Sequence, residues 1–336
     1  MDTYTSIHGM RSQSRASRAL RTAAVLLTAV ALICVLVAAL TFRYANATMR
    51  REPKVVENFS SNVMPGYSIV GFKSLDGTAL SGWFFPAKGT PRGTVVMVHG
   101  DSVNRLQFGD ATPALYKSLV DRKFNVLSFD LRHSGDSEGR LTTYGYDEWE
   151  DVLAAVDYAR KTTTTTGVVL YGFGSGAGAA LAAWEQLPAT EADRNEVPSS
   201  VAALPLLRDY VLAMMLDGPL DSPDDSIRLA MDRLGLPSFF PFSATVPLAV
   251  RLSAGASSEY PLAALASRFQ RPMLVLEPLP ADGKRSILLA ERLRLQPETT
   301  TVYEKAVDGS SGATLYGTDP KAYQAELTEF LDQYFP

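Results

Sequence analysis

Apolar residues are distributed unevenly along the chain, with one long block near its start. The segment from Thr22 to Phe42 holds 21 residues without a charge. As a helix it would span about 32 Å, close to the thickness of the hydrocarbon core of a bilayer. Four arginines lie between residues 11 and 21, and basic residues favour the cytoplasmic side of a membrane span. We therefore expect a cytoplasmic tail at 1–21, one transmembrane helix at 22–42 and an extracytoplasmic C-terminal domain at the cell membrane.

The same block has a second interpretation as a secretory signal peptide. Ala45-Asn46-Ala47 follows it and has the pattern of a cleavage site. The block is longer than the apolar core of a typical signal peptide, which favours an anchor that stays in the mature chain. Basic residues such as Arg43 and Arg50 also follow the block, so the charge difference that sets its orientation is small.

After a polar linker at 43–65, short apolar blocks alternate with helical patterns. The predicted strands are Tyr67–Phe72, Ala79–Phe85, Thr94–Val98, Asn125–Phe129, Val168–Tyr171, Leu212–Leu216 and Met273–Leu276. The predicted helices are Ala111–Asp121, Tyr146–Arg160, Gly176–Gln186 and Ala322–Tyr334. This alternation predicts an α/β domain at 66–336, with a mainly parallel sheet covered by helices on both faces. Residues 219–260, rich in Pro and Ser, are expected to form a small cap or an irregular crossing.

Composition excludes several classes of function. The net charge is −4, and no basic stripe interleaved with aromatic residues is present, so nucleic acid is not an expected partner. Cys34 is the single cysteine and lies in the apolar block, which excludes a disulfide framework. With three histidines in the chain, we expect neither a zinc site nor another bound cofactor.

A glycine-rich segment at 168–178 is the most informative part of the sequence. Its order is an apolar strand, a turn with three glycines at alternate positions, and an alanine-rich helix. Serine hydrolases place their nucleophile on such a strand–turn–helix element, with the pattern G-x-S-x-G. Here the glycine frame is present, but its centre is Gly174, and Ser175 stands one residue later.

Four segments in order resemble motifs of the α/β-hydrolase superfamily. They are the early hairpin at Asp76–Trp83, the strand and His-Gly turn at Val95–Gly100, the D-x-R-x-x-G-x-S-x-G segment at Asp130–Gly139 and the glycine-rich turn at Leu170–Gly178. The resemblance is greatest to membrane-anchored serine hydrolases of the dipeptidyl-peptidase-like kind. It implies an α/β-hydrolase fold preceded by one transmembrane helix.

The resemblance also assigns positions to a catalytic triad. The nucleophile position falls on Gly174, the acid position on Asp282 and the base position near Gly312. Neither Gly174 nor Gly312 can supply the hydroxyl or imidazole that a triad needs. The oxyanion loop would comprise four consecutive residues, His99, Gly100, Asp101 and Ser102.

Alternative roles stay open for three of these side chains. Ser175 is either a residue that caps or starts the helix, or a displaced nucleophile. Asp282 is either a turn residue before Gly283 or the remaining acid. His99 is either a structural hydrogen-bonding residue or a displaced base. An intact oxyanion loop would leave a pocket for an anion or a carbonyl group even without catalysis.

Three functions are compatible with this sequence. The first is a pseudoenzyme, a membrane-anchored binding protein or a subunit of a membrane complex, in contact with the bilayer through 22–42. The second is an active esterase, lipase or peptidase with a relocated site, in which Ser175 acts with His99 or His133. The third is a lyase or isomerase that uses Asp282 or Glu277. We expect the first, because nucleophile and base are both missing from their positions.

Overall fold

The computed structural model describes residues 5–57, 59, 63–280, 294–296, 298–307 and 315–336. Its centre is an eight-stranded sheet. The strands are β1 Ser68–Lys73, β2 Ala79–Phe85, β3 Gly93–Val98, β4 Phe124–Phe129, β5 Val168–Phe173, β6 Val211–Asp217, β7 Met273–Pro280 and β8 Thr300–Val307. Their order in space is β1-β2-β4-β3-β5-β6-β7-β8. Only β1 and β2 run antiparallel to their neighbours, so the predicted mainly parallel sheet is confirmed.

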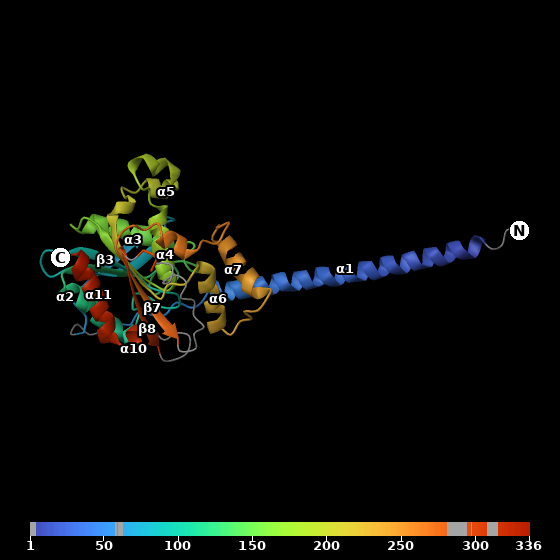
Figure 1. Cartoon of the computed structure of the whole chain (residues 1–336), viewed down its shortest axis with the longest axis horizontal. Coiled ribbons are helices and arrows are strands. Elements are labelled where there is room, and N and C mark those ends of the chain that lie inside the picture. Colours follow the sequence, from blue (N-terminus) through green and yellow to red (C-terminus); the bar gives the residue numbers. More distant parts are fainter. Residues whose placement is uncertain (1–4, 58, 60–62, 281–293, 297, 308–314) are drawn as a thin grey trace.

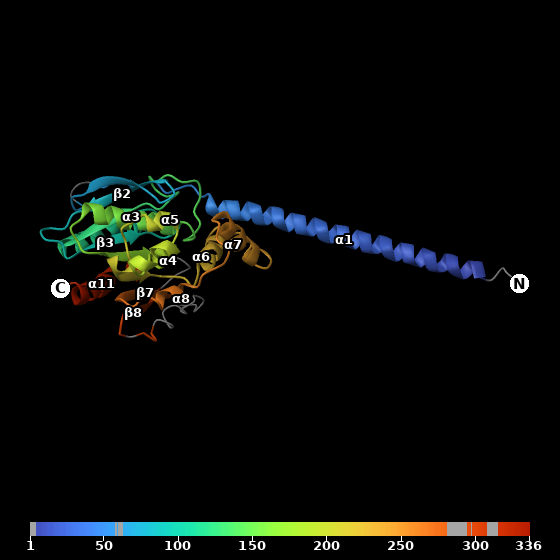
Figure 2. The same cartoon turned by 90° about the horizontal axis from the view of Figure 1, so that it is seen from above.

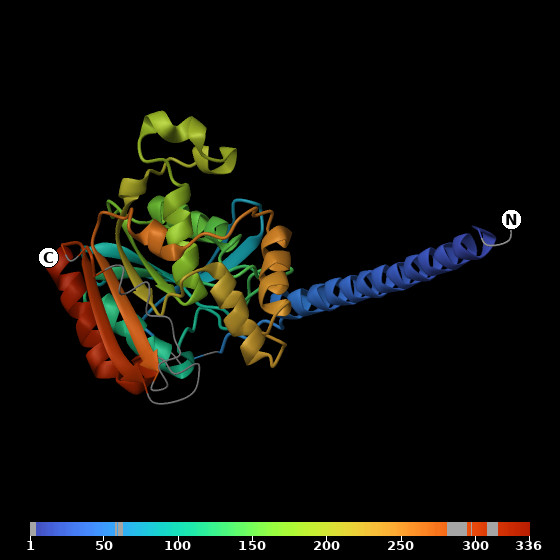
Figure 3. The same ribbon diagram turned by 45° about the vertical axis from the view of Figure 1, so that its right-hand side comes forward.

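Helices cover both faces of this sheet, as predicted (Figure 1). One face carries α2 Thr112–Asp121 and α11 Pro320–Tyr334, and the other carries α3 Glu148–Thr162 and α4 Ser175–Gln186. Shorter helices are α5 Ser199–Ala202, α8 Leu262–Ala266 and α10 Leu315–Thr318, with 3-10 turns η1 Gly109–Ala111, η2 Glu191–Glu196 and η3 Arg208–Tyr210. The segment with η2 and α5 projects from the rest of the domain (Figure 3).

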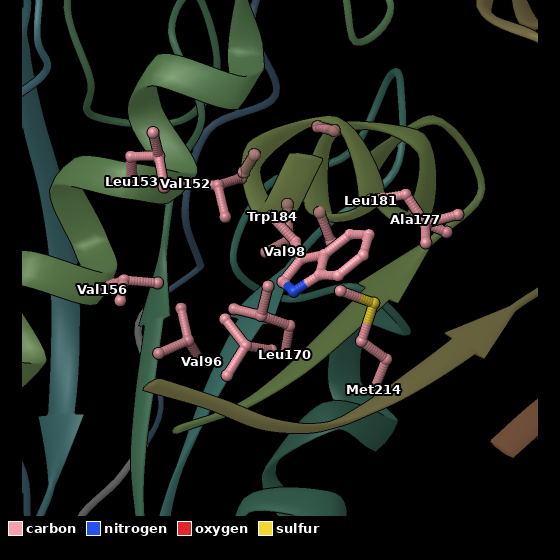
Figure 4. Packing of buried hydrophobic residues seen from close by; sticks show 14 of the residues in the cluster. Val96, Val98, Val152, Leu153, Val156, Leu170, Ala177, Leu181, Trp184 and Met214 are labelled. Carbon is pink, nitrogen blue, oxygen red and sulfur yellow. The ribbon is translucent and has the colours of Figure 1, made fainter. Parts of the chain in front are cut away.

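The central strands are apolar throughout because both of their faces are buried. In β3, Val96 and Val98 pack under α3 and α4, whereas Val95 and Met97 point to the face of α2 and α11. Figure 4 shows the first of these layers, in which Trp184 of α4 lies over the strands. The alternation places one hydrophobic core on each side of the sheet and fixes its register.

Two helices form a cap at the end of the domain next to the N-terminal helix. They are α6 Pro223–Arg233 and α7 Phe242–Ser253. Of the two predictions for 219–260, the cap is therefore correct and the irregular crossing is wrong. Pro247 lies inside α7. Because proline is unfavourable in a helix interior, the sequence around it does not predict a helix.

The N-terminal helix α1 runs from Thr5 to Met49 and extends away from the domain (Figures 1 and 2). Its segment Ser17–Met49 is long and apolar enough to cross a membrane. The helix is longer than the predicted 22–42 at both ends, because Ala, Leu and Arg beside the apolar block are good helix formers. Its last turns pack against α6 and α7 through Ala45 and Met49.

The D-x-R segment after β4 organises the loops at this edge of the sheet. The buried Asp130 carboxylate accepts hydrogen bonds from the Arg105 backbone N–H at 2.7 Å and from the Arg105 side chain. Arg132 pairs with the buried Asp151 of α3 at 2.8 Å. Burial alone would lower the pKa of Arg132, but the hydrogen bonds to Asp151 outweigh it and raise this pKa. The motif therefore joins the loop after β3 and helix α3 to the end of β4.

The turn between β5 and α4 brings helix and strands unusually close. A Cβ on Gly176 would lie 2.2 Å from the His99 carbonyl oxygen and 2.4 Å from that of Val98. A Cβ on Gly172 would lie 2.5 Å from the Ala177 Cα. Real Cβ atoms do not make such contacts, so this packing requires glycine at both positions.

We predict that Gly176→Ala destabilises the domain by about 3 kcal/mol, because the methyl group meets backbone atoms that cannot rotate away. Gly178→Ala is the matched control in the same helix. Its Cβ meets only a Leu262 methyl at 3.2 Å, and the change should stay within about 1 kcal/mol of wild type. Urea unfolding followed by tryptophan fluorescence measures both. Equal effects at the two positions would contradict the close approach.

Candidate functional site

The candidate site is a pocket at the carboxyl ends of three central strands. Residues that follow β3, β4 and β5 line it, together with the linker after α1. Strand β3 lies between β4 and β5: the chain passes from β3 to β4 on one side, and then from β4 to β5 on the other side of β3. Ligands of open α/β sheets bind at such a switch point. The pocket contains His99, Gly100, Asp101, Ser102 and Ser175, so the structure brings these predicted site residues together.

Gly174 occupies the turn between β5 and α4 in a conformation that suits glycine. Its φ is 51° and its ψ is −118°, which other residues adopt only with strain. Its backbone N–H donates to the Asp217 carbonyl oxygen at 2.8 Å. A Cβ at this position meets no heavy atom within 4 Å, so there is space for a side chain above the turn. The backbone shape of a nucleophile position is thus present without a hydroxyl.

Ser175 is the first residue of α4 and is buried. It lines the same pocket as His99 and His133. No side-chain hydrogen bond from a capping residue closes this helix, and Ser175 stands inside the helix rather than at the capping position, which Gly174 fills. Of the two structural roles expected for Ser175, the structure therefore shows the start of the helix, and the capping position belongs to Gly174.

His99 uses both ring nitrogens in hydrogen bonds to the backbone. Nδ1 donates to the Gly100 carbonyl oxygen at 2.7 Å, and Nε2 accepts from the Leu131 N–H at 2.9 Å. Burial lowers the pKa of His99, which keeps the ring neutral near pH 7. In this arrangement neither nitrogen is available to take a proton from Ser175, and the ring connects the loops after β3 and β4.

His133 is a different case, because its Nε2 is buried without a hydrogen-bond partner in the described part of the chain. It lies in the loop after β4, at a φ of 56°, and lines the pocket. Of the two histidines, it is the one whose ring nitrogen could accept a proton there.

The linker after α1 contributes a charged side chain to the pocket. The Arg51 guanidinium donates to the Ser102 hydroxyl, to the Tyr144 hydroxyl at 3.3 Å and to the Ala230 carbonyl oxygen at 3.5 Å. It also lies 4.0 Å from the Asp101 carboxylate. Arg51 thus connects the oxyanion loop, the loop after β4 and the cap helix α6.

The linker backbone is held on both sides of Arg51. The Asn104 side-chain amide donates to the Lys54 and Val55 carbonyl oxygens, each at 3.1 Å. The Thr142 N–H donates to the Met49 carbonyl oxygen at 2.9 Å, and the Tyr144 hydroxyl donates to the Thr48 carbonyl oxygen at 2.8 Å. We call residues 50–55 the strap, because they cross the pocket between these attachments.

With the strap in place, the pocket has an accessible volume of about 30 Å³. This is enough for about one water molecule, whereas sites for small-molecule ligands typically measure about 300–1,000 Å³. A substrate larger than a few atoms would therefore require the strap to move.

A buried carboxylate, that of Glu148, also lines the pocket. Glu148 accepts hydrogen bonds from the Thr143 N–H at 2.7 Å, from the Gly145 N–H at 2.7 Å and from two threonine hydroxyls. Burial alone would raise the pKa of Glu148, but these bonds and the charge of Arg132 outweigh it and lower this pKa. Glu148 is therefore ionised at neutral pH and fixes the 142–148 loop that carries Tyr144.

Two predicted triad positions, Asp282 and Gly312, lie outside the described residues. Glu277 lies within β7 and is buried. The structure adds Asp217, which sequence reasoning missed. It ends β6 beside Gly174, and its carboxylate accepts a hydrogen bond from the Tyr323 hydroxyl of α11 at 2.6 Å. Among the described residues, no group of three or more His, Cys, Asp or Glu could hold a metal ion.

Comparison with known proteins identifies a family and several similar sequences. A family model described as the alpha/beta hydrolase family matches residues 95–335. The uncharacterised protein YfhR of Salmonella typhimurium is 38% identical over 95 residues, which cover 27% of this chain and 30% of that protein. YfhR of Escherichia coli K12 is 32% identical over 115 residues, 33% of this chain and 38% of its own length. The chain thus matches less than half the length of these relatives.

Solved structures with the same fold include two esterases. The Pyrococcus furiosus esterase Pf2001 superposes with a TM-score of 0.62 at 19% identity, over 86% of this chain and 99% of the esterase. The esterase RhEst1 from Rhodococcus sp. ECU1013 superposes with a TM-score of 0.53 at 16% identity, over 80% of this chain and 99% of the esterase. At these identities the likeness concerns the fold alone. By its motifs, its sheet and the match to the family model, the chain belongs to the alpha/beta hydrolase family.

Proposed function

We propose that this chain is a single-pass membrane protein whose hydrolase-fold domain is catalytically inactive. It serves as a binding protein or as a subunit of a membrane complex. The observation that supports this most is Gly174, because the turn that holds the nucleophile in hydrolases of this fold has no reactive side chain. Scaffold and activity are separable in such folds.

The histidine geometry supports the same conclusion. A serine nucleophile needs an imidazole nitrogen within about 3.2 Å to take its proton. His99 has both nitrogens engaged with the backbone, and no described hydrogen bond joins Ser175 to His133. The strap adds a second obstacle, since it occupies the space in which a substrate would meet the turn.

Retention of the N-terminal helix is supported by its packing. Ala45 belongs to the pattern that resembles a cleavage site, yet it lies in a helical turn buried against the cap, with 2% of its surface exposed. Removal of residues 1–47 would expose the apolar cap surface that Ala45 and its neighbours cover. We therefore propose an uncleaved anchor, with a cytoplasmic N-terminus and an extracytoplasmic domain.

A second candidate is a serine hydrolase with a relocated site. His133 favours it, because its buried Nε2 has no partner among the described residues and faces the same pocket as Ser175. In this alternative Ser175 attacks the substrate carbonyl and His133 accepts its proton. The strap would have to leave the pocket first.

We predict that the full-length protein hydrolyses short-chain p-nitrophenyl esters no faster than the solvent background. Gly174→Ser should also be inactive, because a serine hydroxyl without its imidazole is not an effective nucleophile. Steady-state assays in detergent measure both. Hydrolysis by wild type that disappears in Ser175→Ala and in His133→Ala would establish the second candidate instead.

We predict that the mature protein keeps residues 22–42. The intact mass of the membrane-extracted protein should include this segment, and sodium carbonate should not release it from membranes, since a spanning helix is held by about 20 apolar residues. An N-terminus near Thr48 together with a carbonate-soluble protein would show that the helix is a cleaved signal.

We predict that Arg51→Ala loosens the strap. Loss of hydrogen bonds from a charged group costs about 1–3 kcal/mol, so amide exchange at 50–55 should accelerate by about tenfold. Arg50→Ala is the matched control, because Arg50 is the exposed first residue of the strap and its side chain donates to the Asn46 side chain of α1, at 2.8 Å, on the side away from the pocket loops in the sequence. Hydrogen–deuterium exchange by mass spectrometry compares them. Equal exchange in both variants would show that Arg51 does not hold the strap.

A further inference from the structure

The cap contains an uncharged segment on the surface of the domain. Between Arg233 and Arg251 there are 17 residues, Leu234–Val250, without Asp, Glu, Lys or Arg, although these make up 20% of the chain. The segment includes Phe239 and Phe240, whose surfaces are 66% and 82% exposed. Large aromatic side chains with this exposure require an explanation when they lie next to one another.

Exposed apolar residues continue along one side of α7. Ala244, Leu248 and Leu252 are exposed and lie four residues apart in α7, so they form a stripe along the helix, which Phe239 and Phe240 precede in the sequence. The buried residues of α7 include Phe242, Val246 and Val250, and each of these three lies two positions before an exposed residue of the stripe. Since two residues turn a helix by about 200°, the stripe faces away from the core of the cap.

Contacts with α1 set the position of α7 relative to the apolar block. The Thr245 hydroxyl lies 2.7 Å from that of Thr41, and the Phe242 ring packs edge-on against Tyr44 at 5.2 Å. Val37 and Leu40 also pack against the cluster that contains Val246 and Val250. Val37, Leu40 and Thr41 belong to the uncharged run 22–42. Val37 lies five residues inside its end, about 7–8 Å along the helix axis.

The direction of α7 completes the geometry. It crosses α1 steeply and is the element at the end of the domain from which α1 extends (Figures 1 and 3). If α1 crosses a bilayer, α7 runs roughly along the membrane plane, at the level where the apolar block ends. Helices that lie in this plane bury one apolar face about 5–10 Å into the boundary between headgroups and acyl chains.

We infer that the stripe, defined as Phe239, Phe240, Ala244, Leu248 and Leu252, is a second membrane contact that inserts into the bilayer surface beside α1. The occupant of this surface is lipid, because the stripe is continuous with a helix that enters the apolar phase at the same level. The inference rests on the membrane anchor of the proposed function. Its consequence is that the domain lies against the membrane in one orientation, with the strap and the pocket close to the lipid headgroups.

The test uses acyl-chain quenching in the full-length protein. Native Cys34, exposed on α1, is labelled with bimane and reports on the anchor. In a Cys34→Ser background, Phe240→Cys and Leu252→Cys report on the two ends of the stripe. Gln333→Cys is the control, because it is exposed on α11 at the end of the domain opposite α1. Each protein is placed in phosphatidylcholine nanodiscs with or without nitroxide-labelled acyl chains.

We expect the nitroxide lipid to reduce the fluorescence at positions 34, 240 and 252 by about twofold or more, and to leave position 333 unchanged. Quenching at 34 without quenching at 240 and 252 would overturn the inference and leave the anchor in place. That result would point to a protein partner on the stripe. Absence of quenching at 34 would refute the anchor, and the inference with it.

Discussion

The close approach of α4 to the central strands is the constraint on which the rest of the structure depends. Gly172 and Gly176 allow the first turn of α4 to pack against the backbone at the ends of β3 and β5. This contact places the turn at the switch point of the sheet, and the pocket forms above it. Packing requires glycine at these two positions, whereas Gly174 between them has space for a side chain, so neighbouring positions of the turn meet separate demands.

The strap and the cap extend this constraint to the N-terminal helix. Arg51 joins the loops around the turn to α6, and the end of α1 packs on α6 and α7. The pocket, the cap and the end of α1 are therefore directly connected, and the strap lines the pocket at the switch point of the sheet. In this arrangement the residues around the pocket stabilise the attachment of the domain to α1.

Much of this fold could be predicted from apolar periodicity and glycine spacing, but some of it could not. Strand β8 was missed because it is an edge strand with Glu304 and Lys305, a charge pattern typical of a loop. The roles of Arg51 and Asp217 depend on partners about 50 to 180 residues away in the sequence. Motif resemblance pointed to residues 99–102 and to the turn, which line one pocket in the structure, whereas no local pattern indicates that a linker lines this pocket as well.

Covalent labelling by a fluorophosphonate probe tests the central claim most directly. The probe reacts with activated serines irrespective of the substrate that an enzyme prefers. Full-length protein in native membranes should remain unlabelled, both as wild type and as Arg51→Ala, whose loosened strap admits the probe to the pocket. A probe adduct on Ser175, located by peptide mass spectrometry and lost in His133→Ala, would show that this domain is an active serine hydrolase.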